Sequence, residues 1–138
     1  MRKRSQSREF ALQILYQIDI TRDNFEQAWD GFWFTSVEKE VEDVVKDFTR
    51  ALVKGVADNL NTIDLKISQY AQNWELERMA VVDRNILRLG AYEILFCSDI
   101  PPKVSINEAV ELAKKYSDVQ AGKFVNGILD KIKSDKPK

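Results

Sequence analysis

The sequence predicts an all-α protein whose single domain is a bundle-like arrangement of about seven helices. Apolar residues recur with helical spacing in successive segments, and no segment shows the alternation of apolar and polar residues that marks a strand. Of the 138 residues, 44% are apolar, which suits a packed core and not a disordered chain. These observations together predict helices packed around one core.

The first two helices are expected at about residues 5–21 and 23–33. The apolar stripe of the first repeats every four residues: Phe10, Ile14 and Ile18. Asp23, followed three positions later by Glu26, resembles a capping box, in which two side chains bind the free N–H groups at the start of a helix. The short helix that follows would be rich in aromatic residues: Trp29, Phe32 and Trp33.

A long third helix is expected to begin near Ser36. Its apolar stripe consists of Val37, Val41, Val44, Val45, Phe48 and Leu52. Gly55 lies inside this helix, where glycine costs about 1 kcal/mol relative to alanine. Such a glycine usually marks a close crossing of two helices, so we expect another helix to approach the chain at Gly55.

The fourth helix is expected at about residues 62–71 and the fifth at about 77–97. The fifth has the most apolar sequence, with Met79, Val82, Ile86, Leu89 and Ile94 on it. We therefore expect it to be the central and most buried element. Pro101 and Pro102 follow it, and the helix should end before them because proline disfavours a helical conformation in the residue that precedes it.

Two further helices are expected after the prolines. Ser105 and Glu108 have the spacing of a capping box, which predicts a sixth helix over residues 106–116. A last helix is expected from about residue 118 to residue 133. Its apolar face would contain Ala121, Val125, Ile128, Leu129 and Ile132.

No internal repeat, low-complexity tract or long linker divides the chain, so we expect one domain over residues 1–138. Its N-terminal half, about 1–72, and its C-terminal half, about 73–138, would meet near residues 70–74. The sequence contains neither a signal-like segment nor an apolar run of about 18 residues, so we expect no association with a membrane.

Charge is unevenly distributed along the chain, although the formal net charge is only −1. The first eight residues contain no acid and four bases: Arg2, Lys3, Arg4 and Arg8. Acidic residues outnumber basic ones over residues 23–66, and lysines outnumber acids from residue 101 to the end. Two basic ends permit a local site for an anionic ligand that the net charge conceals.

The sequence offers little for catalysis. Histidine is absent, which excludes a His-based general base, a His-containing triad and a His-ligated metal. The single cysteine, Cys97, excludes an internal disulfide and suits a reducing compartment, most simply the cytoplasm, and its apolar surroundings favour a buried structural role. The carboxylates are expected at exposed helix positions beside lysines, as surface pairs. We therefore expect no enzymatic activity, no metal and no cofactor.

The first helix carries a second strip of side chains opposite its apolar stripe on a helical wheel. This outward strip contains Arg8, Leu12 and Tyr16, with Gln13 at its margin and Arg4 one turn earlier. An exposed ring beside guanidinium groups suits single-stranded nucleic acid, because bases stack on the ring while arginine contacts phosphate. Alternatively, Leu12 and Tyr16 pack under a neighbouring helix or a dimer partner.

The last helix offers a similar pair at the edge of its apolar face. Lys123 points away from the predicted core and Phe124 lies on the flank. The pair could be a second stacking platform with a phosphate contact. Phe124 could equally be an ordinary aromatic residue at the edge of the core.

Four segments, in order along the chain, resemble the motifs of the NusB family. They are REFALQILYQ at residues 8–17, VDRNILRLGAYE at 82–93, VSINEAVELAK at 104–114 and KFVNGILD at 123–130. The resemblance implies an all-helical protein of two small subdomains that acts in transcription antitermination. It also implies binding of single-stranded boxA RNA together with the ribosomal protein NusE, notably in ribosomal RNA operons. RNA polymerase and other Nus factors would be indirect partners.

The resemblance further implies roles for individual residues. Asp83 on the fifth helix would face the ribosomal-protein partner. The Arg4–Arg8 segment is less rich in arginine than is usual in the family, so RNA binding would depend more on that partner. The residues expected to contact RNA are Arg2, Lys3, Arg4, Arg8, Gln13, Tyr16, Lys123 and Phe124.

Two other functions remain open from the sequence. The chain could be a helical protein-interaction scaffold, or a homodimer, that binds no RNA. It could also be the RNA-binding module of an rRNA methyltransferase, although little sequence follows the last motif. The scaffold differs from the RNA-binding protein in that it would show no salt-dependent affinity for RNA.

Overall fold

The computed structural model of the protein describes residues 2–35 and 40–137. These residues form seven α-helices and two short 3₁₀ turns, and no strand occurs among them, which confirms the predicted all-α class. The helices are α1 (Lys3–Thr21), α2 (Phe25–Thr35), α3 (Asp43–Asp58), α4 (Leu60–Tyr70), α5 (Val81–Phe96), α6 (Pro102–Tyr116) and α7 (Val119–Ile132). Within this part of the chain, no helix is both long enough and apolar enough to cross a bilayer.

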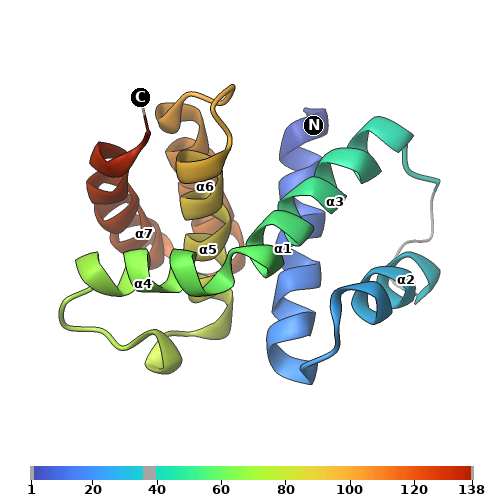
Figure 1. Ribbon diagram of the computed structural model, residues 1–138, viewed down its shortest axis with the longest axis horizontal. Helices are drawn as coiled ribbons and strands as arrows, with labels where there is room; N and C mark the ends of the chain where they lie inside the picture. The colour runs from blue at the N-terminus through green and yellow to red at the C-terminus, as the bar shows by residue number, and fades with distance from the viewer. Residues whose placement is uncertain (1, 36–39, 138) are drawn as a thin grey trace.

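The helices lie in two groups side by side (Figure 1). In one group α1 packs against α2 and α3, and in the other α4 packs against α5 and α7. The central helix is α5, which contacts α1, α3, α4, α6 and α7 and therefore joins the two groups. The central position predicted for the fifth helix is confirmed. The division of the chain near residue 72 stays a prediction, and α4, which precedes that point, packs with the C-terminal helices.

One hydrophobic core contains side chains from both groups. Leu52 of α3, Ile63 of α4 and Leu129 of α7 are completely buried in it, as is Ile86 of α5. Burying a side chain of this size contributes about 1.5–3 kcal/mol. The core thus consists of apolar residues from helices that are distant in sequence. The all-α prediction rested on the helical spacing of such residues.

The close helix crossing predicted at Gly55 is confirmed. A Cβ atom placed on Gly55 would lie 2.1 Å from Cζ of Tyr92 on α5, closer than two carbon atoms can approach. Gly90 on α5 is similar, because its Cβ would lie 2.6 Å from Cδ1 of Leu129 on α7. The absence of a side chain at these two positions lets α5 pack tightly against α3 and α7.

The capping box of α2 lies one residue later than predicted. The Asn24 side-chain oxygen accepts a hydrogen bond from the backbone of Gln27 at 2.8 Å, and the Asn24 backbone donates to the Gln27 side chain at 3.2 Å. Asp23 instead belongs to the turn after α1, where its backbone donates to the Thr21 hydroxyl. The shift follows from Arg22, whose positive φ of 64° turns the chain at the end of α1.

The third helix begins at Asp43, later than predicted. Positions 36 and 37, where the predicted helix would begin, lie outside the described residues, and residues 40–42 are not helical. Val44 is 54% exposed and does not belong to the buried stripe, whereas Val45 and Leu52 do.

The sixth helix begins at Pro102, three residues before the predicted capping residue. Proline suits the first helical position because its missing N–H would have no partner there. Ser105 therefore lies inside the helix, and its hydroxyl donates to the Glu93 carboxylate at 3.0 Å. The last helix, by contrast, begins close to the predicted residue 118, and the Asp118 carboxylate caps it by accepting a hydrogen bond from the backbone N–H of Ala121.

Candidate nucleic-acid interface

A cavity of about 510 Å³ lies where the middle of α1, the start of α5 and the end of α6 meet. Tyr16, which is 45% exposed, and Gln13 line it from α1, and Tyr116 lines it from α6. Gln13 is also exposed, and its side-chain nitrogen donates to the Tyr116 hydroxyl at 3.4 Å. The structure thus brings two predicted site residues together and adds a second tyrosine.

The chemistry of this cavity suits an unstacked base. Tyrosine rings are platforms for base stacking, and Val81 and Val82 supply an apolar wall. The Gln13 amide carries both donors and an acceptor, so it can pair with the edge of a base. Leu12, predicted on the exposed strip, is only 2% exposed and lies at the base of this cavity, so that prediction is wrong.

Tyr116 is held in place by Glu9. Its hydroxyl donates to the Glu9 carboxylate at 2.8 Å, and the Lys115 ammonium binds the same oxygen. Burial, together with this hydrogen bond, raises the pKa of Tyr116 above its ordinary value, so the phenol stays neutral. Tyr116 was not among the residues predicted from the sequence, although its place as an aromatic residue at the end of a predicted helix was a visible signal.

A second cavity, of about 330 Å³, adjoins the first, because Ala80 lines both. Phe124 borders it and is partly buried, with its ring in an edge-on contact with Trp74 at 5.9 Å between centroids. Lys123 is exposed beside Phe124. Trp74, which is 58% exposed, was also missed, although a tryptophan within a polar segment was a visible signal.

Asp83 lines the second cavity from the first turn of α5. Its Oδ1 atom is buried and has no hydrogen-bond partner in the described part of the protein. Burial raises the pKa of Asp83 above the ordinary value for a carboxyl group. Its neighbour Arg84 pairs with Asp19 instead, so among the described residues no ion pair accounts for Asp83.

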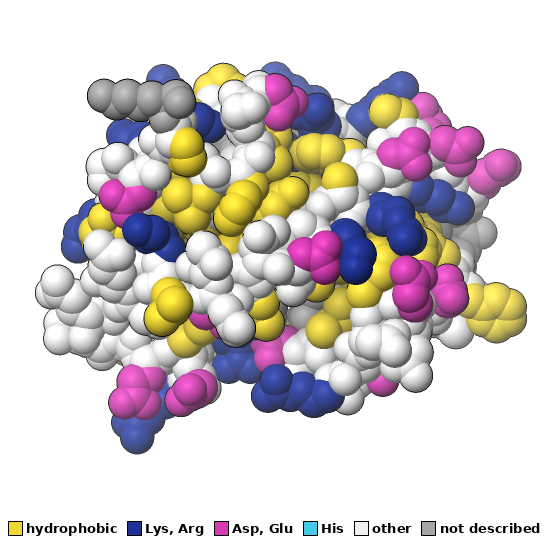
Figure 2. Space-filling model, in the orientation of Figure 1, with side chains coloured by type: hydrophobic (Ala, Val, Ile, Leu, Met, Phe, Trp, Pro, Cys, Tyr) yellow, Lys and Arg dark blue, Asp and Glu magenta, His cyan; other side chains and the backbone are white. Residues whose placement is uncertain are grey.

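The basic N-terminal segment lies far from these cavities. Arg4 precedes Tyr16 by twelve residues, which is about 18 Å along a helix. Arg2, Lys3 and Arg4 are exposed, and the Arg4 guanidinium lies 4.4 Å from the centroid of the Phe48 ring. In the face shown in Figure 2, basic and acidic side chains are interspersed around hydrophobic ones. Lys3 pairs with Glu42 at 3.0 Å and Arg4 with Asp99 at 3.6 Å, but these side chains are exposed, so solvent screens both pairs. Positive charge therefore lies at the N-terminus, separate from the aromatic cavity.

The prediction that Arg8 lies on the exposed strip is wrong. Its side chain is 3% exposed, and its guanidinium donates to the Glu93 carboxylate at 2.7 and 2.8 Å. A second carboxylate, that of Glu108, lies 3.3 Å away. Burial alone would lower the pKa of Arg8, but these acids raise it above its ordinary value. The prediction for α1 rested on a helical wheel with a single buried face. In the structure α1 packs against α3 on one side and against α5 on another, so more of its surface is covered.

The expectation that the carboxylates lie at the surface is wrong for Glu93 and also for Asp19. The Asp19 side chain is 5% exposed and lies 2.7 Å from Arg84 and 2.9 Å from Arg88. Burial by itself would raise the pKa of Asp19. Hydrogen bonds from Arg84 and Asn85 and the charge of Arg88 have the larger, opposite effect and lower the pKa to about 2. Two buried ion-pair networks therefore fix α1 on α5.

Cys97 lies at the C-terminal end of α5 and is partly buried, not fully buried as expected. Burial raises the pKa of its thiol above the ordinary value, which disfavours the nucleophilic thiolate. In the part of the chain that the structure describes, no group of three or more Cys, Asp or Glu side chains could hold a metal ion.

Comparison with known proteins identifies close relatives. The sequence model of the NusB family matches residues 5–134. The transcription antitermination protein NusB of Anaeromyxobacter sp. (strain Fw109-5) is 49% identical over 98% of this chain and 92% of its own length. That of Oceanobacillus iheyensis is 46% identical over 94% of this chain and 97% of its own length.

Solved structures of the same kind share the fold. T. maritima NusB superimposes with a TM-score of 0.88 at 39% identity, over 98% of this chain and 93% of its own. A crystal structure of the antitermination factors NusB and NusE in complex with dsRNA gives a TM-score of 0.84 at 29% identity, over 98% of both chains.

Proposed function

The chain belongs to the NusB family, and on this premise we propose that it is a transcription antitermination factor that binds RNA together with the ribosomal protein NusE. The names of its relatives and the NusB–NusE–RNA complex among its structural neighbours support this function. The RNA would be a single-stranded boxA-type segment, notably in ribosomal RNA operons. Bound in this way, the protein would help RNA polymerase, with other Nus factors, to resist termination.

The observation that carries the RNA-binding proposal is the exposed Tyr16 ring at a cavity that it shares with Gln13 and Tyr116. A base of a single strand can leave its stack, lie against Tyr16 and reach the Gln13 amide. A base inside a duplex cannot do so without being extruded. The geometry therefore favours single-stranded RNA, with Phe124 and the adjacent Lys123 as a second contact.

The exposed basic side chains at the N-terminus supply the electrostatic part of the proposal. Arg2, Lys3 and Arg4 can contact phosphates because their side chains reach solvent. Arg8 has no direct part in RNA binding, since its guanidinium is committed to two carboxylates inside the protein. With a net charge of −1, the chain attracts RNA only locally, so a partner that adds positive charge would strengthen binding.

NusE is the proposed protein partner, and Asp83 is the proposed contact. A carboxylate with one buried, unpartnered oxygen is costly, and a donor from a bound protein would reduce that cost. The protein would act in the cytoplasm beside RNA polymerase. We propose no catalytic activity for it, because the relatives that it matches over nearly their whole length are named as transcription antitermination proteins.

RNA binding can be tested by fluorescence anisotropy with labelled boxA-like RNA, scrambled RNA and a duplex of the same length, with and without NusE. We expect the single strand to bind most tightly, and more tightly still with NusE present. Tyr16→Ala should weaken RNA binding by about 1–3 kcal/mol through lost stacking. Phe34→Ala, which removes an 88% exposed ring from α2, is the matched control and should bind like wild type. Equal losses in the two variants would overturn the site, and no RNA binding in any mixture would overturn the function.

A further inference from the structure

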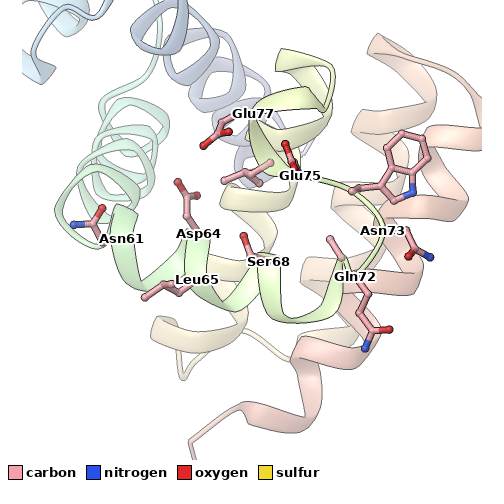
Figure 3. A pocket seen from close by; sticks show the side chains of 11 residues that line it. Asn61, Asp64, Leu65, Ser68, Gln72, Asn73, Glu75 and Glu77 are labelled. Atoms are coloured by element: carbon pink, nitrogen blue, oxygen red, sulfur yellow. The ribbon is translucent and has the colours of Figure 1, made fainter.

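The cavity lined by Tyr16 suits an RNA base better than the larger groove beside α4 does. That groove, of about 830 Å³, is bordered by the carboxylates of Asp64 on α4 and of Glu75 and Glu77 on the opposite wall (Figure 3). Among the described residues that line it there is no Lys or Arg, so the groove repels phosphate. The side chains that could distinguish one base from another are therefore those around the Tyr16 cavity.

Four polar side chains form a chain of hydrogen bonds that ends at the Tyr16 cavity. The Lys115 ammonium and, at 2.8 Å, the Tyr116 hydroxyl bind the same oxygen of the Glu9 carboxylate. The Tyr116 hydroxyl is also bound, at 3.4 Å, by the side-chain nitrogen of Gln13. Tyr116 and Gln13 line the cavity, so the chain of bonds connects Glu9, which is only 14% exposed, to the place where a base would lie.

The carboxylate of Glu9 fixes the direction of every bond in this chain. A carboxylate only accepts hydrogen bonds, so both Lys115 and Tyr116 must donate to it. The hydrogen bond to Glu9 raises the pKa of Lys115, and burial together with the bond to Glu9 raises the pKa of Tyr116, so both groups keep their protons. The hydroxyl proton of Tyr116 is thus already donated, and the hydroxyl oxygen can only accept from Gln13.

The direction of these bonds determines how the Gln13 amide is turned. The nitrogen and oxygen ends of an amide have nearly the same shape, so a glutamine without a fixed partner can turn either end toward a base. Here the Tyr116 oxygen accepts, which holds the nitrogen of Gln13 toward Tyr116. No described residue donates to the Gln13 carbonyl oxygen, which is therefore available to accept a hydrogen bond from a base.

An acceptor held in this direction distinguishes two classes of base. Adenine and cytosine carry an exocyclic amino group that donates, whereas guanine and uracil carry a carbonyl oxygen at the corresponding ring position, which would repel the Gln13 oxygen. We propose that the Glu9–Tyr116 pair positions Gln13 so that the cavity selects a base with an amino group. Glu9 and Tyr116 are then positioning residues that act through Gln13. This inference rests on the proposed function, since it takes single-stranded RNA as the ligand.

Fluorescence anisotropy with NusE present tests the inference. Each position of a labelled boxA-like RNA is synthesised with an amino base and with its keto counterpart: adenine against hypoxanthine, or cytosine against uracil. The ratio of the two affinities is the base preference. At one position we expect the wild type to prefer the amino base by roughly three- to tenfold, the effect of one hydrogen bond. Gln13→Ala should abolish this preference.

Two further variants test the positioning of the amide. Tyr116→Phe removes only the hydroxyl, so it frees the Gln13 amide to turn and should bring the preference close to one while the ring remains for stacking. Glu9→Gln should have the same effect, because glutamine can donate to Tyr116 and so reverse the direction of the bonds. The matched control is Tyr70→Phe, which should keep the wild-type preference. It removes a hydroxyl that also donates to a carboxylate, that of Asp135 at 2.7 Å, but lines neither RNA cavity.

The outcomes separate the inference from the proposed function. A ratio of two affinities in one sample does not depend on the folded fraction, so a loss of stability cannot imitate the expected result. An undiminished preference in Tyr116→Phe or Gln13→Ala, or an equal loss in Tyr70→Phe, would overturn the inference and leave the function standing. A preference of the wild type for keto bases, or for neither class at any position, would do the same. Failure of the wild type to bind any of these RNAs would overturn both.

Discussion

Replacing Arg8 by methionine should destabilise the fold and leave the RNA surface of the folded protein intact. The Arg8 side chain is 3% exposed and its nitrogens lie 2.7 and 2.8 Å from the oxygens of Glu93, which is itself 2% exposed. Methionine fills a similar volume but removes the positive charge. The Glu93 carboxylate would then be buried with the Ser105 hydroxyl, at 3.0 Å, as its remaining close donor.

The expected magnitude follows from this burial. Removing one partner of a buried ion pair costs about 3–5 kcal/mol, because the other charge stays buried without compensation. Domains of this size are stable by only about 5–15 kcal/mol, so the loss is a large part of the total. Adding Glu93→Gln removes the stranded charge, and the double variant should recover much of the loss. Arg8→Met with Glu93→Gln should therefore be more stable than Arg8→Met alone.

Urea denaturation followed by tryptophan fluorescence measures the free energies of unfolding, and anisotropy in the absence of urea measures RNA affinity. Per folded molecule, RNA affinity and its dependence on salt should match wild type. A phosphate contact by Arg8 would instead make the slope of log affinity against log salt shallower by about 0.7 and leave stability nearly unchanged. That second pattern would refute the assignment of Arg8 to the interior.

Three further predictions concern other parts of the molecule. Asp19 has a pKa of about 2, below the ordinary value of 3.8, so its carboxylate stabilises the fold above pH 4 and this contribution is lost as the pH falls through 2; the difference corresponds to about 2 kcal/mol. Between pH 4 and 2 the free energy of unfolding should fall more steeply in wild type than in Asp19→Asn, and parallel curves of this free energy against pH would contradict the prediction. Gly55→Ala should destabilise by about 1–3 kcal/mol because its Cβ would overlap Tyr92, whereas Gly127→Ala, with nothing within 4 Å, should stabilise slightly in chemical denaturation; similar values for both would show that the helix crossing is looser than described. Arg4→Ala should make the salt slope for RNA binding shallower by about 0.7, equally for boxA-like and scrambled RNA, and a loss confined to boxA-like RNA would instead indicate a base contact.

The sequence by itself determined the secondary structure and the family. Each helix was visible because its residues bury one face, which leaves a repeat of three or four residues in the sequence. Gly55 could be identified as a crossing point because a glycine inside a helix lets another helix approach its backbone closely. Tyr16 and Gln13 were also placed correctly at the surface, since the exposed margin of α1 remains exposed in the fold.

Only the tertiary structure decided which polar side chains are buried and which surfaces adjoin. Arg8 is covered by Glu93, which lies 85 positions away along the chain, and Arg84, which binds Asp19, lies 65 positions from it. The periodicity of one helix shows that a face is apolar, but it does not show whether another helix also covers the opposite face. A charged group can be buried when a partner of opposite charge lies within hydrogen-bond distance, and that distance is set by the crossing of α1 and α5. The contact between Trp74 and Phe124 of α7 likewise exists only because the fold packs α4 against α7.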